Sequence, residues 1–245
     1  MNRMRFAVIA LMLATLASSL RADESNAAMD CAVRLYAPLV AKRNDGAVLS
    51  AAWAEEGWLR VREVPTALPV HVYEAALSTQ RPSWKITFAL ERNCSLIGGD
   101  VNEVLGVNLR SDEREAFALM QYNSVIGDGV PTTYDDPLRA AKDVLYLVSF
   151  ADEFVVLRRV EDVPLRPQGA KRDEKRTLAA LSKDISAPTV EKSAAGMVIV
   201  RFFTWHKGSG AVQFNSVVLH PDGRVSLSMF ALASGVGDWH VHVLM

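Results

Sequence analysis

Residues 197–232, MVIVRFFTWHKGSGAVQFNSVVLHPDGRVSLSMFAL, decide the fold of this chain. The stretch contains three apolar runs that two turn sequences, KGSG at 207–210 and PDG at 221–223, separate from one another. Proline and glycine are favoured in tight turns, and consecutive hairpins pair their strands antiparallel. The stretch therefore predicts a C-terminal β-meander of three strands: Met197–Trp205, Val212–Leu219 and Val225–Leu232.

The last of these runs shows which way its side chains face. Val225, Leu227, Met229 and Ala231 alternate with Arg224, Ser226 and Ser228. A period of two with one apolar side indicates a half-buried strand in an antiparallel sheet. Helical segments elsewhere in the chain are grouped and do not alternate with strands, so the fold class is α+β, with antiparallel sheet(s), a C-terminal β-meander and segregated helices.

The first half of the mature chain, residues 23–160, is expected to be an α+β region. A helix is predicted over residues 28–43, with Pro38 bending or breaking it. The alternation in residues 83–91 predicts a strand, with weaker strand candidates at 58–64 and 70–73. Residues 111–122 fit either a helix or a strand.

The second half continues with a helix that starts at Asp136-Pro137 and ends near Lys142. Two apolar runs, Val144–Phe150 and Phe154–Val160, then suggest a hairpin. Residues 161–175 are rich in proline and charge and are expected to form an exposed connection or linker. Residues 176–245 then supply a helix and the meander, either in the same domain or in a second one.

The N-terminus has the three-part pattern of a secretion signal. Arg3 and Arg5 precede an apolar run over residues 6–17, and small and polar residues follow. The run is shorter than the roughly 20 residues that a membrane-spanning helix needs. Residues 1–22 are therefore predicted to be a cleaved signal peptide, and the protein is expected in the periplasm or secreted, without a transmembrane segment. Cleavage after Ala17 or after Ala27 is the alternative to cleavage after Ala22.

The chain has two cysteines, Cys31 and Cys94. An even cysteine count in an exported protein predicts a disulfide. Two free buried thiols are the alternative. A catalytic thiol is not expected, because the chain has no Cys-x-x-Cys motif and nothing recognisable that would lower a thiol pKa.

Composition and charge exclude several classes of function. Half of the residues are hydrophobic and 22% are charged, as in ordinary globular proteins. Loss of residues 1–22 leaves 24 basic and 28 acidic residues, a net charge of −4, which argues against nucleic acid as a partner. The sequence contains no phosphate-binding loop, dinucleotide fingerprint or Gly-x-Ser-x-Gly elbow, and it predicts no catalytic residue and no cofactor.

The histidines offer one candidate site. His240 and His242 would point to the same side of a strand, and His206 ends an earlier strand of the meander. Three imidazoles can hold Zn²⁺ with a bound water, which is the chemistry of a metal-dependent hydrolase. The simpler interpretation is a polar strand face that carries imidazoles. The sequence thus favours a non-enzymatic binding, adaptor or accessory module with a protein or small-molecule partner in the cell envelope, and the hydrolase is the alternative.

Overall fold

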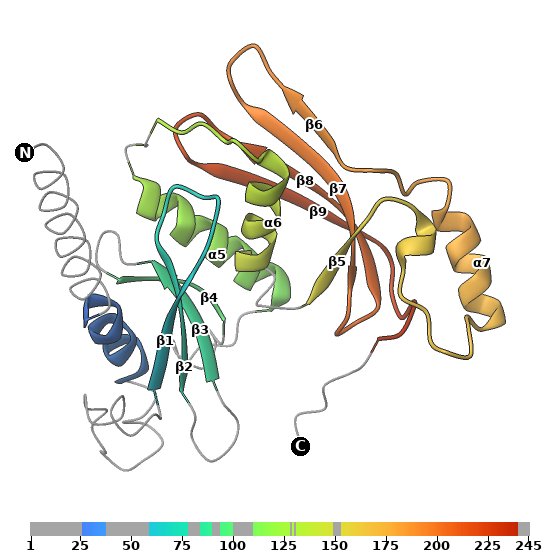
Figure 1. The fold of residues 1–245 in the computed structure, drawn as a ribbon, viewed down its shortest axis with the longest axis horizontal. Coiled ribbons are helices and arrows are strands. Elements are labelled where there is room, and N and C mark those ends of the chain that lie inside the picture. The colour runs from blue at the N-terminus through green and yellow to red at the C-terminus, as the bar shows by residue number, and fades with distance from the viewer. Residues whose placement is uncertain are drawn as a thin grey trace, which may run out of the picture.

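The structure is a computed structural model that describes residues 26–37, 59–77, 84–89, 94–99, 110–127, 129, 131–148 and 153–239. The predicted signal peptide, residues 1–22, lies outside these residues. The described chain forms a mixed α+β fold with two antiparallel sheets (Figure 1), which confirms the predicted class. No helix within the described ranges is long and apolar enough to cross a membrane.

The N-terminal sheet has four strands in the order β1-β2-β3-β4. Its strands are β1 (Leu59–Val64), β2 (Val72–Leu77), β3 (Trp84–Ala89) and β4 (Ser95–Gly99). All neighbours are antiparallel, and the register places Tyr73 opposite Phe88. The strand predicted at 83–91 is therefore present as β3, and the candidate at 58–64 is β1. The candidate at 70–73 overlaps β2 only at residues 72–73.

The C-terminal sheet contains the predicted meander. Its strands are β5 (Phe154–Leu157), β6 (Thr189–Lys192), β7 (Val198–His206), β8 (Ala211–Leu219) and β9 (Val225–Ala233). β7, β8 and β9 pair in sequence order, while β5 and β6 both pair with the other side of β7. The meander is confirmed, and β6 was not anticipated from the sequence.

Helices lie between and outside the two sheets (Figure 1). They are residues 26–37, α5 (Ser111–Ile126), α6 (Pro137–Val148), the short 3-10 turn η1 (Val160–Asp162) and α7 (Arg172–Leu181). Helices α5 and α6 contact strands of both sheets. Residues 26–37 pack on the far side of the N-terminal sheet, and α7 packs on the far side of the C-terminal sheet.

Two predictions about helices require correction. Residues 144–148 belong to α6 and do not form the first strand of a hairpin. Ala140, Ala141, Val144, Leu145 and Val148 recur at helical spacing and are all buried between the sheets. The short apolar run over 144–150 suggested a strand because seven residues cannot distinguish the two periodicities.

The other helix boundaries also differ from the expected ones. The ambiguous segment 111–122 is helical, as part of α5. The first helix is described from residue 26 to residue 37, immediately before Pro38, and the remainder of the predicted span, 38–43, lies outside the described residues. α7 starts at Arg172, so part of the expected connection 161–175 is helical.

The buried residues form three hydrophobic clusters. The central cluster joins both sheets to α5 and α6 and includes Val72, Tyr122, Leu145 and Val217. We call the face of the C-terminal sheet that packs on this cluster its inner face. The opposite, outer face carries Phe203 and Trp205 and packs partly on α7.

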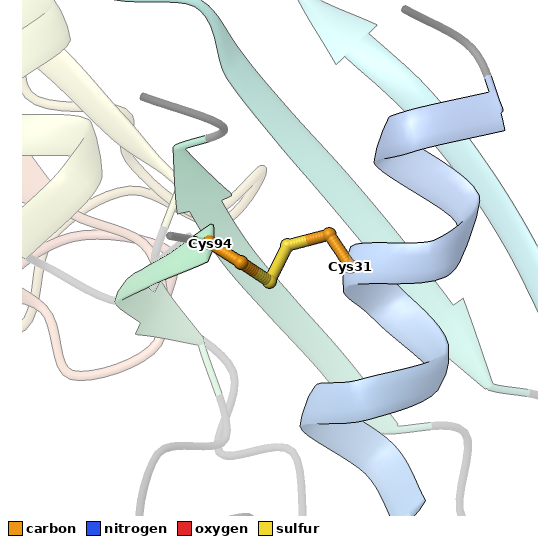
Figure 2. The surroundings of a disulfide bond; sticks show 2 residues. All are labelled: Cys31 and Cys94. Atoms are coloured by element: carbon orange, nitrogen blue, oxygen red, sulfur yellow. A yellow bond between two sulfur atoms is a disulfide. The ribbon is translucent and has the colours of Figure 1, made fainter. Parts of the chain in front are cut away.

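The disulfide Cys31–Cys94 joins the first helix to the start of β4 (Figure 2). The two Cα atoms are 5.6 Å apart, and the side chain of Cys31 is fully buried. Nearby, the Tyr36 hydroxyl donates a hydrogen bond to the Ala75 carbonyl at 3.0 Å. The predicted disulfide is therefore present, and it fastens this helix to the N-terminal sheet.

Candidate functional site

The structure describes only one of the three histidines that the sequence nominated. His206 ends β7, while His240 and His242 lie outside the described residues. Within the described ranges, no three histidine, cysteine or acidic side chains form a group that could hold a metal ion. The zinc site of His206, His240 and His242 therefore stays a prediction.

His206 belongs to a buried polar row on the inner face of the C-terminal sheet. Its Nε2 atom lies 3.1 Å from the Thr204 hydroxyl, and Asn215 Nδ2 donates to that same hydroxyl at 2.9 Å. Thr204 and Asn215 are fully buried, and His206 is 4% exposed. The Phe154 ring, whose centroid is 5.9 Å from that of His206, packs against the imidazole.

Two oxygen atoms in this row lack a hydrogen-bond partner among the described residues. No described group donates a hydrogen bond to Asn215 Oδ1 or to the buried Oε1 of Gln213, which lies on the strand position opposite Thr204. Buried acceptors of this kind are usually satisfied by an ordered water. The row therefore offers acceptors for water or another hydrogen-bond donor, beside the buried Thr204 hydroxyl and His206 imidazole.

A second polar cluster surrounds Glu74 on β2. Arg62 lies 2.8 Å from its carboxylate, Lys85 lies 2.6 Å away, and the Tyr146 hydroxyl donates at 3.0 Å. Burial opposes ionisation of Glu74, but the hydrogen bonds from Lys85, Tyr146 and Arg62 and the charge of Lys85 together hold its pKa below the usual value.

The pKa values of Lys85 and Tyr146, two partners of Glu74, are shifted in the direction expected of a structural ion pair. Burial by itself would lower the pKa of Lys85, yet contact with Glu74 and Tyr146 raises it, so the amine is kept protonated and is not a nucleophile. Burial, with the adjacent Glu74 carboxylate, raises the pKa of Tyr146. The cluster connects three strands of the N-terminal sheet to α6 and supports a structural role.

β9 forms an edge of the C-terminal sheet, and this edge is unusual. It pairs with β8 on one side, and no other described strand pairs with it. Its nine residues, VSLSMFALA, contain no charge and no proline. Phe230 is 61% exposed and Leu232 is 41% exposed. Exposed edges of this length are normally protected by charge, proline or a covering element.

The other edge strands have such protection. β1 carries Arg60, Arg62 and Glu63. β6 has only four residues, of which Glu191 and Lys192 are charged. β5, which lies at the same edge and carries no charge, also has only four residues. β4 lies against α5 and α6. The open edge of β9 is therefore the exception among the described strands.

Asn123 of α5 closes one end of this edge. Its Nδ2 donates to the Val225 carbonyl and its Oδ1 accepts from the Val225 N–H, both at 2.9 Å. Both main-chain groups of Val225 therefore point away from β8. Main-chain groups alternate in direction along an antiparallel strand, so those of Leu227, Met229 and Ala231 also point outward.

A β-bulge closes the other end of the open edge. The register with β8 shifts so that Val212 pairs with Ala233 and Gln213 pairs with Ala231, which leaves Leu232 as the extra residue. Bulges bend and twist an edge strand and so end regular pairing. Between Asn123 and this bulge, the outward main-chain groups of Leu227, Met229 and Ala231 have no hydrogen-bond partner among the described residues.

The outer face beside this edge is partly aromatic. Phe203, Phe214 and Phe230 lie opposite one another on β7, β8 and β9, and the first two rings are 5.2 Å apart between centroids. Phe203 is buried, Phe214 is half-buried and Phe230 is exposed. The apolar surface thus extends from the buried region near α7 to the open edge.

Sequence reasoning overlooked most of this site. The absence of charge in residues 225–233 is visible in the sequence and could have identified the edge. The contact between Asn123 and Val225 joins residues 102 positions apart, and no local sequence pattern predicts it. The Glu74 cluster and the row of Thr204, His206 and Asn215 likewise arise only from strand register.

Comparison of the chain with protein-family models, with curated proteins and with solved structures finds no match.

Proposed function

We propose that this protein is a non-enzymatic binding or accessory module, which binds an extended segment of polypeptide along β9. The observation that carries the proposal is the uncharged edge of β9, on which Leu227, Met229 and Ala231 present outward main-chain groups. A segment added to a sheet edge gains main-chain hydrogen bonds, and pockets for its alternate side chains provide specificity.

The surroundings of the edge favour an uncharged, apolar segment. Phe230 on the outer face and Met229 on the inner face would lie beside alternate side chains of the added strand. No charged residue of β9 is present to pair with a charged ligand. A charged side chain brought to this edge would lose hydration without compensation.

The binding test uses synthetic uncharged nine-residue peptides that alternate large apolar and small residues. Fluorescence anisotropy measures their affinity for the mature protein. The matched control peptide has the same sequence with alternate main-chain nitrogens methylated, which removes the donors of one edge. We expect the unmodified peptide to bind and the methylated one to lose at least about tenfold in affinity, about 1.4 kcal/mol.

Two variants locate the binding to one edge. Ala231→Lys places a charge on β9, and Val190→Lys places the same charge on β6, the opposite edge of the same sheet; both residues are exposed. We expect Ala231→Lys to abolish peptide binding and Val190→Lys to leave it unchanged. Equal binding by both variants, or a monomeric wild type that binds no peptide, contradicts the proposal.

We also propose that the module acts after export, in the periplasm or outside the cell. Support comes from the N-terminal signal pattern and from the Cys31–Cys94 disulfide, which is consistent with an oxidising compartment. N-terminal sequencing of the mature protein from the cell envelope tests this. We expect it to begin at Asp23, which keeps the helix 26–37 whole, and an intact Met1 in a cytoplasmic fraction contradicts export.

A further inference from the structure

We infer that the segment bound along β9 is β9 of a second copy of this chain, in antiparallel orientation. This inference rests on the proposed strand addition at β9 and names its partner. The first argument is charge. When two copies of β9 pair about a two-fold axis, each residue lies opposite a residue of the same strand in the other copy. A charged residue near the axis would then lie close to its own copy, which is unfavourable. β9 has no charged residue, so this repulsion is absent.

The second argument is the phase of the main-chain groups. Outward-pointing groups can bond only to outward-pointing groups of the added strand. The available outward main-chain groups are those of Leu227, Met229 and Ala231. Asn123 already bonds the main-chain groups of Val225, and the bulge follows Ala231. A two-fold axis through Met229 pairs Leu227 with Ala231 of the partner and Met229 with its own copy. All three open residues are then used, which gives about six main-chain hydrogen bonds.

The third argument is side-chain size. In this register Leu227 lies beside the small Ala231 of the other copy on the inner face, and Phe230 lies beside the small Ser228 of the other copy on the outer face. Large residues thus face small ones at these positions. Met229 faces its own copy on the axis, where its flexible side chain can adapt to the contact. A shift of the axis by one residue, to Ser228, would pair Ala231 with Val225, whose main-chain groups Asn123 already occupies.

The fourth argument is closure. A two-fold contact uses the same surface on both copies and leaves neither free for a third. The opposite edge of the sheet, formed by the short and charged β6 and by β5, does not offer an equivalent strand. Pairing through β9 therefore yields a dimer with one continuous sheet and does not propagate into a fibre.

Sedimentation velocity of the mature, disulfide-bonded protein measures the assembly. We expect the wild type and Val190→Lys to sediment as dimers and Ala231→Lys as a monomer. A cooperative urea transition of Ala231→Lys, with a far-UV circular dichroism spectrum like that of Val190→Lys, shows that Ala231→Lys is folded. A wild-type dimer that persists unchanged in Ala231→Lys overturns the inference, because the contact then lies elsewhere.

Cysteine cross-linking tests the register. Met229→Cys places the two new thiols on the axis, where paired Cα atoms are about 5.5 Å apart, a separation suited to a disulfide. Ser226→Cys places them about 20 Å apart, six strand positions from one another. We expect mild oxidation to link the first variant at least tenfold more than the second. Equal or reversed linkage overturns the proposed register.

The outcomes distinguish this inference from the function on which it rests. A wild type that stays monomeric at all concentrations, yet binds the uncharged nine-residue peptide, overturns the second copy as partner and leaves strand addition intact. A wild type that neither dimerises nor binds the peptide overturns both.

Discussion

Removal of the Cys31–Cys94 disulfide should lower the free energy of unfolding by about 4 kcal/mol. The bond closes a loop with a sequence separation of 63 residues. In the chain-entropy model, opening a loop of that length returns about 14 cal/mol/K to the unfolded chain, which is about 4 kcal/mol at 25 °C. Cys31 is fully buried, so loss of its sulfur adds a small packing defect in the same direction.

Urea denaturation of Cys31→Ala/Cys94→Ala beside the oxidised wild type measures this loss. The variant should also have a steeper dependence on urea, because an unfolded chain without the cross-link exposes more surface. Wild-type protein kept reduced by a thiol reductant should show a loss of the same size. Tyr36→Phe is the control on the same helix, since it removes the hydroxyl that donates to the Ala75 carbonyl and should cost about 1 kcal/mol.

Two results would refute this reasoning. A loss below about 1 kcal/mol would mean that residual structure already constrains the unfolded chain without the cross-link. A loss of the expected size with an unchanged urea dependence would place the effect in the folded state and not in the unfolded one.

Three further predictions concern stability. Glu74→Ala should cost about 2 kcal/mol at pH 7 by urea denaturation, because it removes hydrogen bonds to a buried carboxylate while the exposed Arg62 and part-exposed Lys85 stay hydrated; since the pKa of Glu74 lies below 4.5, its stabilisation is present above that pH and is lost as pH falls through the folded-state pKa, so Glu74→Gln should flatten the acid side of the stability curve. Gly237→Ala should cost more than Gly169→Ala by about 2 kcal/mol or more: both have positive φ, but an added Cβ meets the Pro164 carbonyl at 2.6 Å in the first and no described atom within 4 Å in the second. Burial raises the pKa of Tyr134 from 10.0 to about 12, so its stabilising contribution should persist to pH 10 and disappear toward pH 12. If the wild type and Tyr134→Phe lose stability equally between pH 10 and pH 12, this prediction is wrong.

The sequence predicted the meander well because its evidence is local. Alternation in Val225, Leu227 and Met229 places these side chains on the inner face, where they contact the central cluster, as expected. Ala231 follows the same alternation but is exposed, because it lies near the strand's end and at the open edge. Local periodicity reveals the face of a side chain and not what covers that face.

The candidate site was much less predictable. His206 is buried against Phe154 and bonded to Thr204, contacts that depend on the pairing of β5 with β7. Nothing close to His206 in the sequence indicates that pairing. The nominated partners His240 and His242 lie outside the described residues, so metal content of the purified protein remains the direct measurement for the zinc prediction.

The sequence by itself determined the fold class, the strands of the meander and the pairing of Cys31 with Cys94. Periodicity, turn residues and a cysteine count of two can all be read from the sequence without knowledge of tertiary contacts. Only the tertiary structure decided that residues 144–148 are helical and that β9 is an open edge closed at one end by Asn123. The physical reason is that burial between two sheets, strand register and edge position depend on contacts between distant residues, and these override or extend local preference.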